Sequence, residues 1–262
     1  MSVIASSSTP PSPFHPNQIT ASDAIMDEFQ GKHYVQLQAQ MQSGKTGCGL
    51  YTAFKMLQDK TIENCFIISG MSDTSIKSQW QKEIRTLGQS YLQLLTDSPS
   101  DLSKIFKKLP TNVYFNRTLE QITDISTISN SLIIIDEIHY GSTAHGSLHK
   151  FLHKFGLQNI IQGQECSILS EHNIYILSIT ATRANEDCIY NNEQDESVKE
   201  NWGRVYMEPG DSYKSIMDYH TQGLVHSNIK LEVANEPKFL EILQKYQSQA
   251  KYFIIRAIGK QR

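Results

Sequence analysis

Residues 39–46 read AQMQSGKT, a loop that contains a glycine and ends in a lysine and a hydroxyl side chain. The loop ends a β-favouring run, 34–40, and opens a helix-favouring stretch, 44–57. In that context backbone N–H groups at the helix start can cradle phosphates, Lys45 can reach the β and γ oxygens, and Thr46 can bind Mg²⁺. A glycine-containing turn before an amphipathic helix is the alternative. We predict a nucleotide-binding loop with contacts from Gln42, Ser43, Gly44, Lys45, Thr46 and Gly47.

Two adjacent carboxylates end a second apolar run in LIIIDEIH, residues 132–139. Asp136 at the strand end would hold Mg²⁺ through its water shell. Glu137 would orient and deprotonate the water that attacks the γ-phosphate. A solvated acidic pair after a buried strand is the alternative. The order along the chain, with the phosphate loop before the carboxylates, favours catalysis, and Lys45, Asp136 and Glu137 are therefore the candidate catalytic residues.

A third segment, SITAT at residues 178–182, follows the apolar residues YIL. A turn rich in Ser and Thr commonly only caps the next helix. Together with AxxxxGKT and DEIH, however, SITAT resembles the S/TAT, Walker A and Walker B elements of superfamily 2 DEAD/DEAH-type helicases and translocases. The resemblance implies an N-terminal RecA-like ATPase lobe that uses ATP and Mg²⁺ and acts on nucleic acid, with DNA favoured over RNA. It also implies that Ser178, Thr180 and Thr182 couple the two sites.

Weaker similarities to the same family assign further residues. Gln18, in FHPNQ (14–18), would bond the adenine edge, although a cap on the first helix is the alternative. His139 would relay between the ATP site and SITAT, or else be a satisfied core histidine. Nucleic-acid backbone contacts would come from Ser69, Gly70, Arg117 and Thr118. An ordinary cap explains Thr118 equally well, and Trp80 is expected in the core rather than stacked on a base.

Strand-favouring and helix-favouring stretches alternate along the chain. We predict strands at 34–40, 65–69, 112–116, 132–136 and 173–180, with helices at 44–57 and 76–88 between them. Such alternation indicates an α/β fold, with a mostly parallel sheet sandwiched by helices. Ligands of such a sheet bind beyond the carboxyl ends of the strands. The phosphate loop and the carboxylate pair both fall at such ends.

Composition narrows the possible partners. The 262 residues carry 24 Lys and Arg against 27 Asp and Glu, a charge of -3 that neither supports nor excludes nucleic acid. The longest apolar run, 132–135, is far shorter than the roughly 20 residues of a membrane helix. We expect no membrane partner and an intracellular location, cytoplasmic or nuclear, a virus-infected cell included. Scattered cysteines and the HxxxHxxxH spacing of His145, His149 and His153 do not favour zinc.

We expect three segments: a disordered leader at 1–13, a RecA-like ATP-binding lobe at 14–235, and a linker helix with the first strand of a truncated second lobe at 236–262. That strand, KYFIIRA (251–257), could instead extend the first sheet. No QxxGRxGR-like segment, which would bring arginine fingers, is present. Residues 207–219 resemble a segment that follows the third motif in some phage and large-virus helicase-like proteins.

The favoured function is an ATP-hydrolysing motor lobe of a helicase or translocase. A P-loop phosphotransferase is one alternative, but SITAT and a water-activating Glu137 favour hydrolysis over transfer to an alcohol. A non-hydrolytic nucleic-acid-binding regulatory module is the other. The presence of Lys45, Asp136 and Glu137 together argues against that module.

Overall fold

The computed structural model describes residues 12–69, 74–95, 100–115, 118–136, 146–181, 196–223, 241–242 and 244–245. The chain divides into two units, Met1–Tyr213 and Lys214–Arg262. In the second unit, α10 (Ile216–Thr221) begins with a capping box in which Ser215 and Asp218 bond each other's backbone N–H groups. Residues 241–242 and 244–245 are helical. The expected strand at 251–257 lies outside the described residues.

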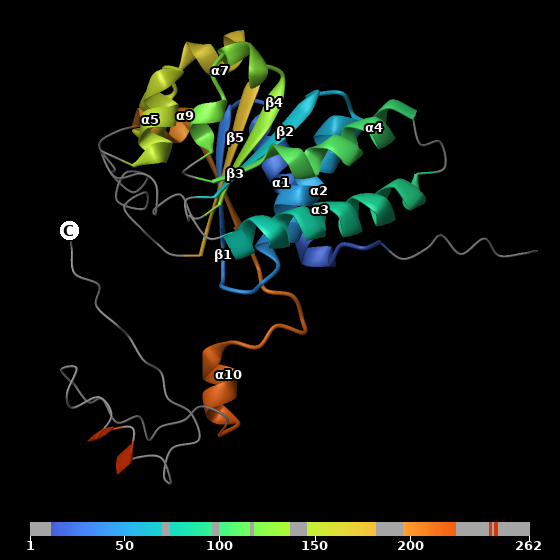
Figure 1. The fold of residues 1–262 in the computed structure, drawn as a ribbon, viewed down its shortest axis with the longest axis vertical. Helices are drawn as coiled ribbons and strands as arrows, with labels where there is room; N and C mark the ends of the chain where they lie inside the picture. The colour runs from blue at the N-terminus through green and yellow to red at the C-terminus, as the bar shows by residue number, and fades with distance from the viewer. Residues whose placement is uncertain are drawn as a thin grey trace, which may run out of the picture. The chain divides into compact units, whose positions relative to one another are not determined.

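The first unit is built on a six-stranded sheet in the order β3-β2-β4-β5-β1-β6, and every pairing between these strands is parallel (Figure 1). The predicted α/β fold is confirmed. The strands are β1 (Tyr34–Ala39), β2 (Asn64–Ser69), β3 (Val113–Phe115), β4 (Ser131–Asp136), β5 (Ile174–Thr180) and β6 (Trp202–Met207).

Helices cover both faces of this sheet (Figure 1). One layer holds α1 (Pro16–Phe29), α2 (Lys45–Gln58), α3 (Thr74–Leu94) and α4 (Ser100–Lys108). The other holds α5 (Ser147–Lys154), α6 (Gln158–Ile161), α7 (Ser167–Glu171) and α9 (Glu196–Asn201). Short 3-10 turns, η1 (Leu109–Asn112), η2 (Leu119–Gln121) and η3 (Ile125–Thr127), flank β3 and lead to β4.

Each layer has its own apolar core because successive side chains of a strand point to opposite faces. In β4, Leu132 and Ile134 join the core under α1–α4, whereas Ile133 and Ile135 join the core under α5–α9. A strand buried on both faces reads as a continuous apolar run. This explains why LIII was recognisable in the sequence.

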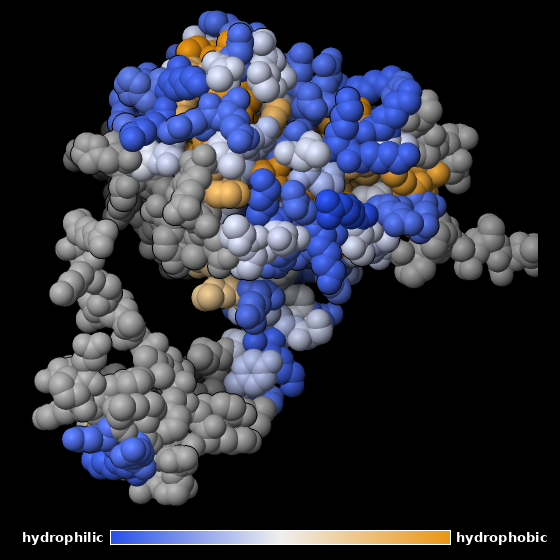
Figure 2. Space-filling model, in the orientation of Figure 1, coloured by the Kyte–Doolittle hydropathy of each residue, from blue (hydrophilic) through white to orange (hydrophobic). Residues whose placement is uncertain are grey.

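The longest helix, α3, is amphipathic. Its buried residues Trp80, Ile84, Gly88 and Tyr91 recur at helical spacing along the side that packs on the sheet. Its outer surface is mainly hydrophilic (Figure 2). Gly88 allows close packing, since a Cβ there would come within 3.2 Å of the Phe106 ring on α4.

Candidate nucleotide-binding site

The strand order brings the predicted chemistry to one edge of the sheet. β5 lies between β1 and β4, and the register pairs Gln38 with Thr180 and Ile179 with Asp136. The carboxyl ends of all three strands therefore lie together. At about 4.8 Å between neighbouring strands, the ends of β1 and β4 are about 10 Å apart, with the end of β5 between them.

The phosphate loop, residues 39–46, reverses the chain between β1 and α2. The Ser43 N–H and hydroxyl both donate to the Gln40 carbonyl, at 3.3 and 2.7 Å. Gln42 has φ 59° and Gly44 has φ 93°, both in the left-handed region. A non-glycine residue there costs about 1–2 kcal/mol, so this loop is held in a strained conformation by its surroundings.

Gly44 is also the N-cap of α2. Because glycine has no side chain, the N-cap residue itself places no capping group over the first N–H groups of the helix. The positive end of the helix dipole lies at the same point. Lys45 and Thr46 open this helix and are half-buried. The arrangement fits an anion with several oxygens.

Gln18 braces this loop from α1. Its Nε2 donates to the Gly44 carbonyl at 2.9 Å, and its Oε1 accepts from the His15 N–H at 2.9 Å. A Cβ at Gly44 or Gly47 would lie 2.5 or 2.4 Å from that Nε2, so a larger residue at either position requires Gln18 to move, and the φ of 93° at Gly44 itself favours glycine. The amide thus caps α1, and the predicted contact with adenine stays a prediction. Each amide atom keeps one further hydrogen-bonding position for it.

Asp136 ends β4, beside Ser69 of β2, and is half-buried. The Trp80 indole N–H donates to Asp136 Oδ2 at 3.0 Å. Trp80 is buried, as predicted, but its bond to the carboxylate was not anticipated. Glu137 and His139 lie outside the described residues.

The sequence over residues 12–185, more than half of the chain, matches the family described as "Type III restriction enzyme, res subunit". The chain belongs to this family. With the parallel sheet and the phosphate loop, membership makes it a helicase-like P-loop ATPase domain.

A Walker-type ATPase from Pyrococcus abyssi matches with 13% identity and a TM-score of 0.35 over 86% of this chain. The match spans 61% of that protein, which is less than two thirds of its length. No curated protein matches the chain significantly.

In this res-subunit family member, the SITAT segment begins inside β5, where Ser178 and Thr180 are both buried. Ser178 is fully buried and accepts a 2.9 Å hydrogen bond from the Tyr34 hydroxyl. Thr180 ends β5, between the ends of β1 and β4. Thr182 lies outside the described residues. Of the two described, Thr180 is the one at the carboxyl ends of the strands, and its coupling role stays a prediction.

The predicted nucleic-acid contacts lie near the ends of β2 and β3. Ser69 is buried, and the Thr118 hydroxyl exchanges hydrogen bonds of 3.1 Å with the N–H and carbonyl of Phe115. These bonds tie Thr118 back to the end of β3, and its side chain does not cap η2, although Thr118 is the N-cap residue of that turn. Lys77, which sequence reasoning missed, lies with Nζ 5.1 Å from the centre of the Phe115 ring. Gly70 and Arg117 lie outside the described residues.

A polar stripe on β1 was also missed. Arg204 of β6 donates to Gln38 Oε1 at 3.0 Å, and Gln36 Oε1, nearly fully buried, has no hydrogen-bond partner among the described residues. The alternation of Gln at 36, 38 and 40 in YVQLQAQ was the available signal. Strands of a parallel sheet are usually apolar on both faces because helices cover both. β1 differs, because one of its faces carries glutamine side chains.

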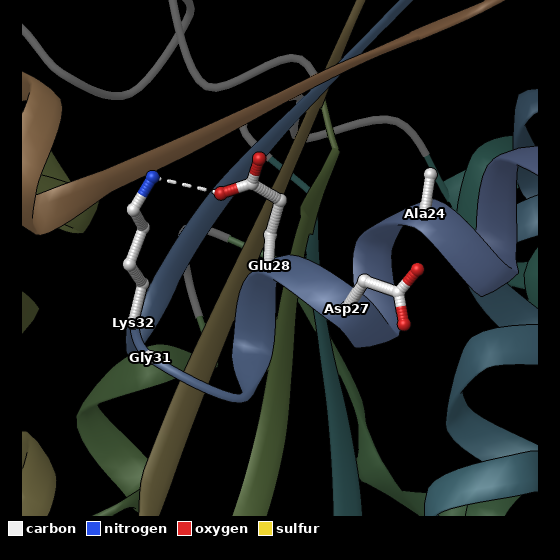
Figure 3. A pocket seen from close by; sticks show the side chains of 5 residues that line it. All are labelled: Ala24, Asp27, Glu28, Gly31 and Lys32. Carbon is white, nitrogen blue, oxygen red and sulfur yellow. Dashed lines mark hydrogen bonds and ion pairs between the residues drawn. The ribbon is translucent and has the colours of Figure 1, made fainter.

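A surface pocket lies away from this site. It is lined by Ala24, Asp27, Glu28, Gly31 and Lys32, with Glu28 and Lys32 paired at 2.8 Å (Figure 3). These residues precede β1, whereas the phosphate loop follows it about 17 Å further along the strand. The pocket therefore belongs to the opposite edge of the sheet.

Two features are absent from the described residues. Those residues contain no cluster of three or more His, Cys, Asp or Glu side chains that could hold a metal ion. No helix in the same part of the chain has the length and apolarity to span a membrane.

Two cysteine thiols lie in the core under α1–α4, one on α2 and one on β2. Cys48 of α2 is fully buried, and Cys65 of β2 is 2% exposed. Burial disfavours the thiolate and raises the pKa of both thiols to about 12. They are structural and not nucleophilic at neutral pH.

Proposed function

We propose that this domain is the ATP-binding first lobe of a superfamily 2, DEAD/DEAH-like motor that hydrolyses ATP and couples hydrolysis to a grip on nucleic acid. One observation carries the proposal. The Gly44-capped start of α2 and the carboxylate of Asp136 lie at the same sheet edge, separated only by β5. A helix start that attracts phosphate thus faces a carboxylate that attracts a metal ion.

The residues at this edge suit Mg²⁺. The ion prefers hard oxygen ligands and keeps several waters, so the Thr46 hydroxyl and the Asp136 carboxylate, with phosphate oxygens, form a suitable set. When bound, Mg²⁺ would neutralise charge on the phosphates.

The chain's own residues would divide the remaining work. Lys45 would bind the β and γ oxygens, and the α2 N–H groups would orient them. Glu137 would take a proton from a water whose oxygen bonds to the γ-phosphorus as the bond to the β-phosphate oxygen breaks, leaving ADP and phosphate. Gln18 would bind adenine, and Thr180, with Ser178, Thr182 and His139, would pass the nucleotide state to the nucleic-acid side.

The nucleic-acid site would lie at the ends of β2 and β3. Ser69, Gly70, Arg117 and Thr118 would contact the backbone, with Lys77 contributing positive charge. DNA is favoured because the family is described as a restriction enzyme subunit. A second RecA-like lobe would complete the ATP cleft, and the setting would be intracellular.

Lys45→Ala tests the site. It removes the only side-chain cation that the loop aims at the phosphates, so MgATP affinity measured by isothermal titration should fall by well over tenfold. The control is Lys55→Ala, which removes a lysine from the far end of the same helix, 3.9 Å from Asp59. Equal affinities for the two variants would contradict the site. Formation of a phosphorylated acceptor in place of free phosphate would favour a phosphotransferase.

A further inference from the structure

Trp80 and Asp136 lie 56 positions apart and meet through a single hydrogen bond at the site edge. Trp80 belongs to the inner side of α3 and is 2% exposed. An aromatic side chain that stacks on a nucleic-acid base must be exposed, so the buried Trp80 ring is not available for stacking. What it presents to the site is its N–H group.

The two tryptophans of this chain donate their indole N–H groups to different kinds of acceptor. A buried indole N–H needs an acceptor, and a backbone carbonyl is sufficient. Trp202, the other tryptophan, is fully buried in the opposite layer and donates to the carbonyl of Ile160. Trp80 donates instead to Asp136 Oδ2, an oxygen of the carboxylate assigned to Mg²⁺.

A charge-assisted bond to one carboxylate oxygen limits rotation of the group about its last side-chain torsion. The buried ring also excludes water from that side of the carboxylate. Partners of this kind orient metal ligands, and their loss typically costs about ten- to a hundredfold in metal affinity or activity.

We propose that Trp80 is a positioning residue for the metal site, holding the Asp136 carboxylate in the orientation that receives Mg²⁺ with ATP. The proposal rests on the proposed ATPase function, since it assigns a metal to Asp136. It concerns the indole N–H alone and requires no contact between Trp80 and nucleotide.

Trp80→Phe in the whole 262-residue chain removes the N–H group and keeps a buried ring. ATP titrations at a series of Mg²⁺ concentrations should show the midpoint for Mg²⁺ rising about ten- to a hundredfold. ATP affinity in EDTA should stay unchanged, because Lys45 and the loop are not altered. Trp202→Phe is the matched control, since it removes an indole bond of the opposite layer, and its Mg²⁺ midpoint should not move.

Equal Mg²⁺ midpoints in the two variants would overturn the inference and leave the proposed function standing. An equal loss of ATP affinity with and without Mg²⁺ in Trp80→Phe would do the same, because it would indicate a general collapse of the loop. Failure of the unsubstituted chain to bind MgATP would overturn the proposed function and the inference with it.

A second measurement leaves position 80 intact. In Trp202→Phe, Trp80 is the only tryptophan, and its fluorescence reports on its N–H partner. Adding Mg²⁺ to the ATP-bound protein should change this emission, and Asp136→Asn should abolish the Mg²⁺-dependent part. Emission that does not respond to Mg²⁺ while MgATP binds would overturn the inference.

Discussion

Glu137 follows directly on Asp136, at the end of the strand that the fold aligns with the phosphate loop. Changing Glu137 to Gln preserves the shape of the side chain and removes its capacity to accept a proton. We expect MgATP binding to be retained and turnover to fall about a hundredfold or more. Steady-state phosphate release and isothermal titration measure the two quantities.

The control is Glu63→Gln, an exposed glutamate just before β2 at the opposite edge of the sheet. It should behave as the unsubstituted chain does. Turnover of Glu137→Gln at the same rate would mean that Glu137 is only a structural carboxylate.

Alanine normally stabilises a helix relative to glycine, but at position 47 of α2 we expect it to destabilise the folded protein. The added Cβ would lie 2.4 Å from Gln18 Nε2, and Gln18 is held between His15 and Gly44. We expect Gly47→Ala to lower the free energy of unfolding by about 1–3 kcal/mol, the usual cost of overpacking. Chemical denaturation measures this.

Two further variants identify the cause. Gly31→Ala places a Cβ in open space and should leave stability nearly unchanged. In a Gln18→Ala background the space is vacated, so Gly47→Ala should cost much less there. A Gly47→Ala cost that is the same in both backgrounds would show that Gln18 is not the obstacle.

Candidate site residues were recognisable from the sequence where the neighbouring residues along the chain define the motif. Contacts between residues far apart in the chain were missed. The phosphate loop was recognisable because β1, the glycine and α2 are contiguous. The bond from Trp80 to Asp136 was not, since its partners lie on α3 and β4. For the same reason Ser178 and Thr180 looked equivalent in SITAT, although Ser178 lies inside β5 and Thr180 is its last residue.

At the level of elements, five strands were predicted and the sixth, β6, was not. Its sequence, WGRVYM, contains a glycine and an arginine and follows a long polar stretch, so its apolar alternation is weak. β6 is an outermost strand of the sheet, with one neighbour, and such residues are tolerated in edge strands. The strand order itself depends on long-range pairing, which propensity does not contain.

The core thiols of α2 and β2 predict how stability depends on pH. Cys48 and Cys65 keep a pKa of about 12 in the folded state because they are buried, against 9.0 as the ordinary value. Above pH 9 the unfolded chain ionises them and the folded chain does not, so folding stability is full below pH 9 and falls as pH rises toward 12. Each thiol contributes up to about 1.4 kcal/mol per pH unit in that window.

Denaturation curves at pH 8, 9, 10 and 11 measure this slope. Replacing both cysteines with alanine should flatten it. A remainder is expected from Tyr51 and Tyr91, since burial raises the pKa of both phenols. An unchanged slope in the double variant would contradict the burial argument for the thiols.

These 262 residues carry the proposed ATP-side motifs without a QxxGRxGR-like segment. An arginine finger is worth about 10³ to 10⁵ in phosphoryl transfer, because it neutralises charge that develops in the transition state. We expect the 262-residue chain alone to bind ATP and to hydrolyse it very slowly, with little stimulation by DNA or RNA. A steady-state assay with and without oligonucleotides measures this.

Brisk turnover stimulated by nucleic acid would contradict that expectation. It would indicate an arginine within this chain or from a second copy, and Arg183, next to SITAT, would be the first to substitute. Activity restored by a separately added second lobe would support the expectation.

The placement of β1 has a consequence for synthesis of the protein. β1 hydrogen-bonds only to β5 and β6 within the described sheet, and these strands begin at residues 174 and 202. A ribosome must therefore add about 140 residues after β1 before its first neighbour exists. Until then β1 cannot join the sheet, and the phosphate loop has no fixed position opposite Asp136. The proposed nucleotide site thus assembles near the end of translation of this unit, and the nascent chain, with β1 still unpaired, is most exposed to aggregation just before that point.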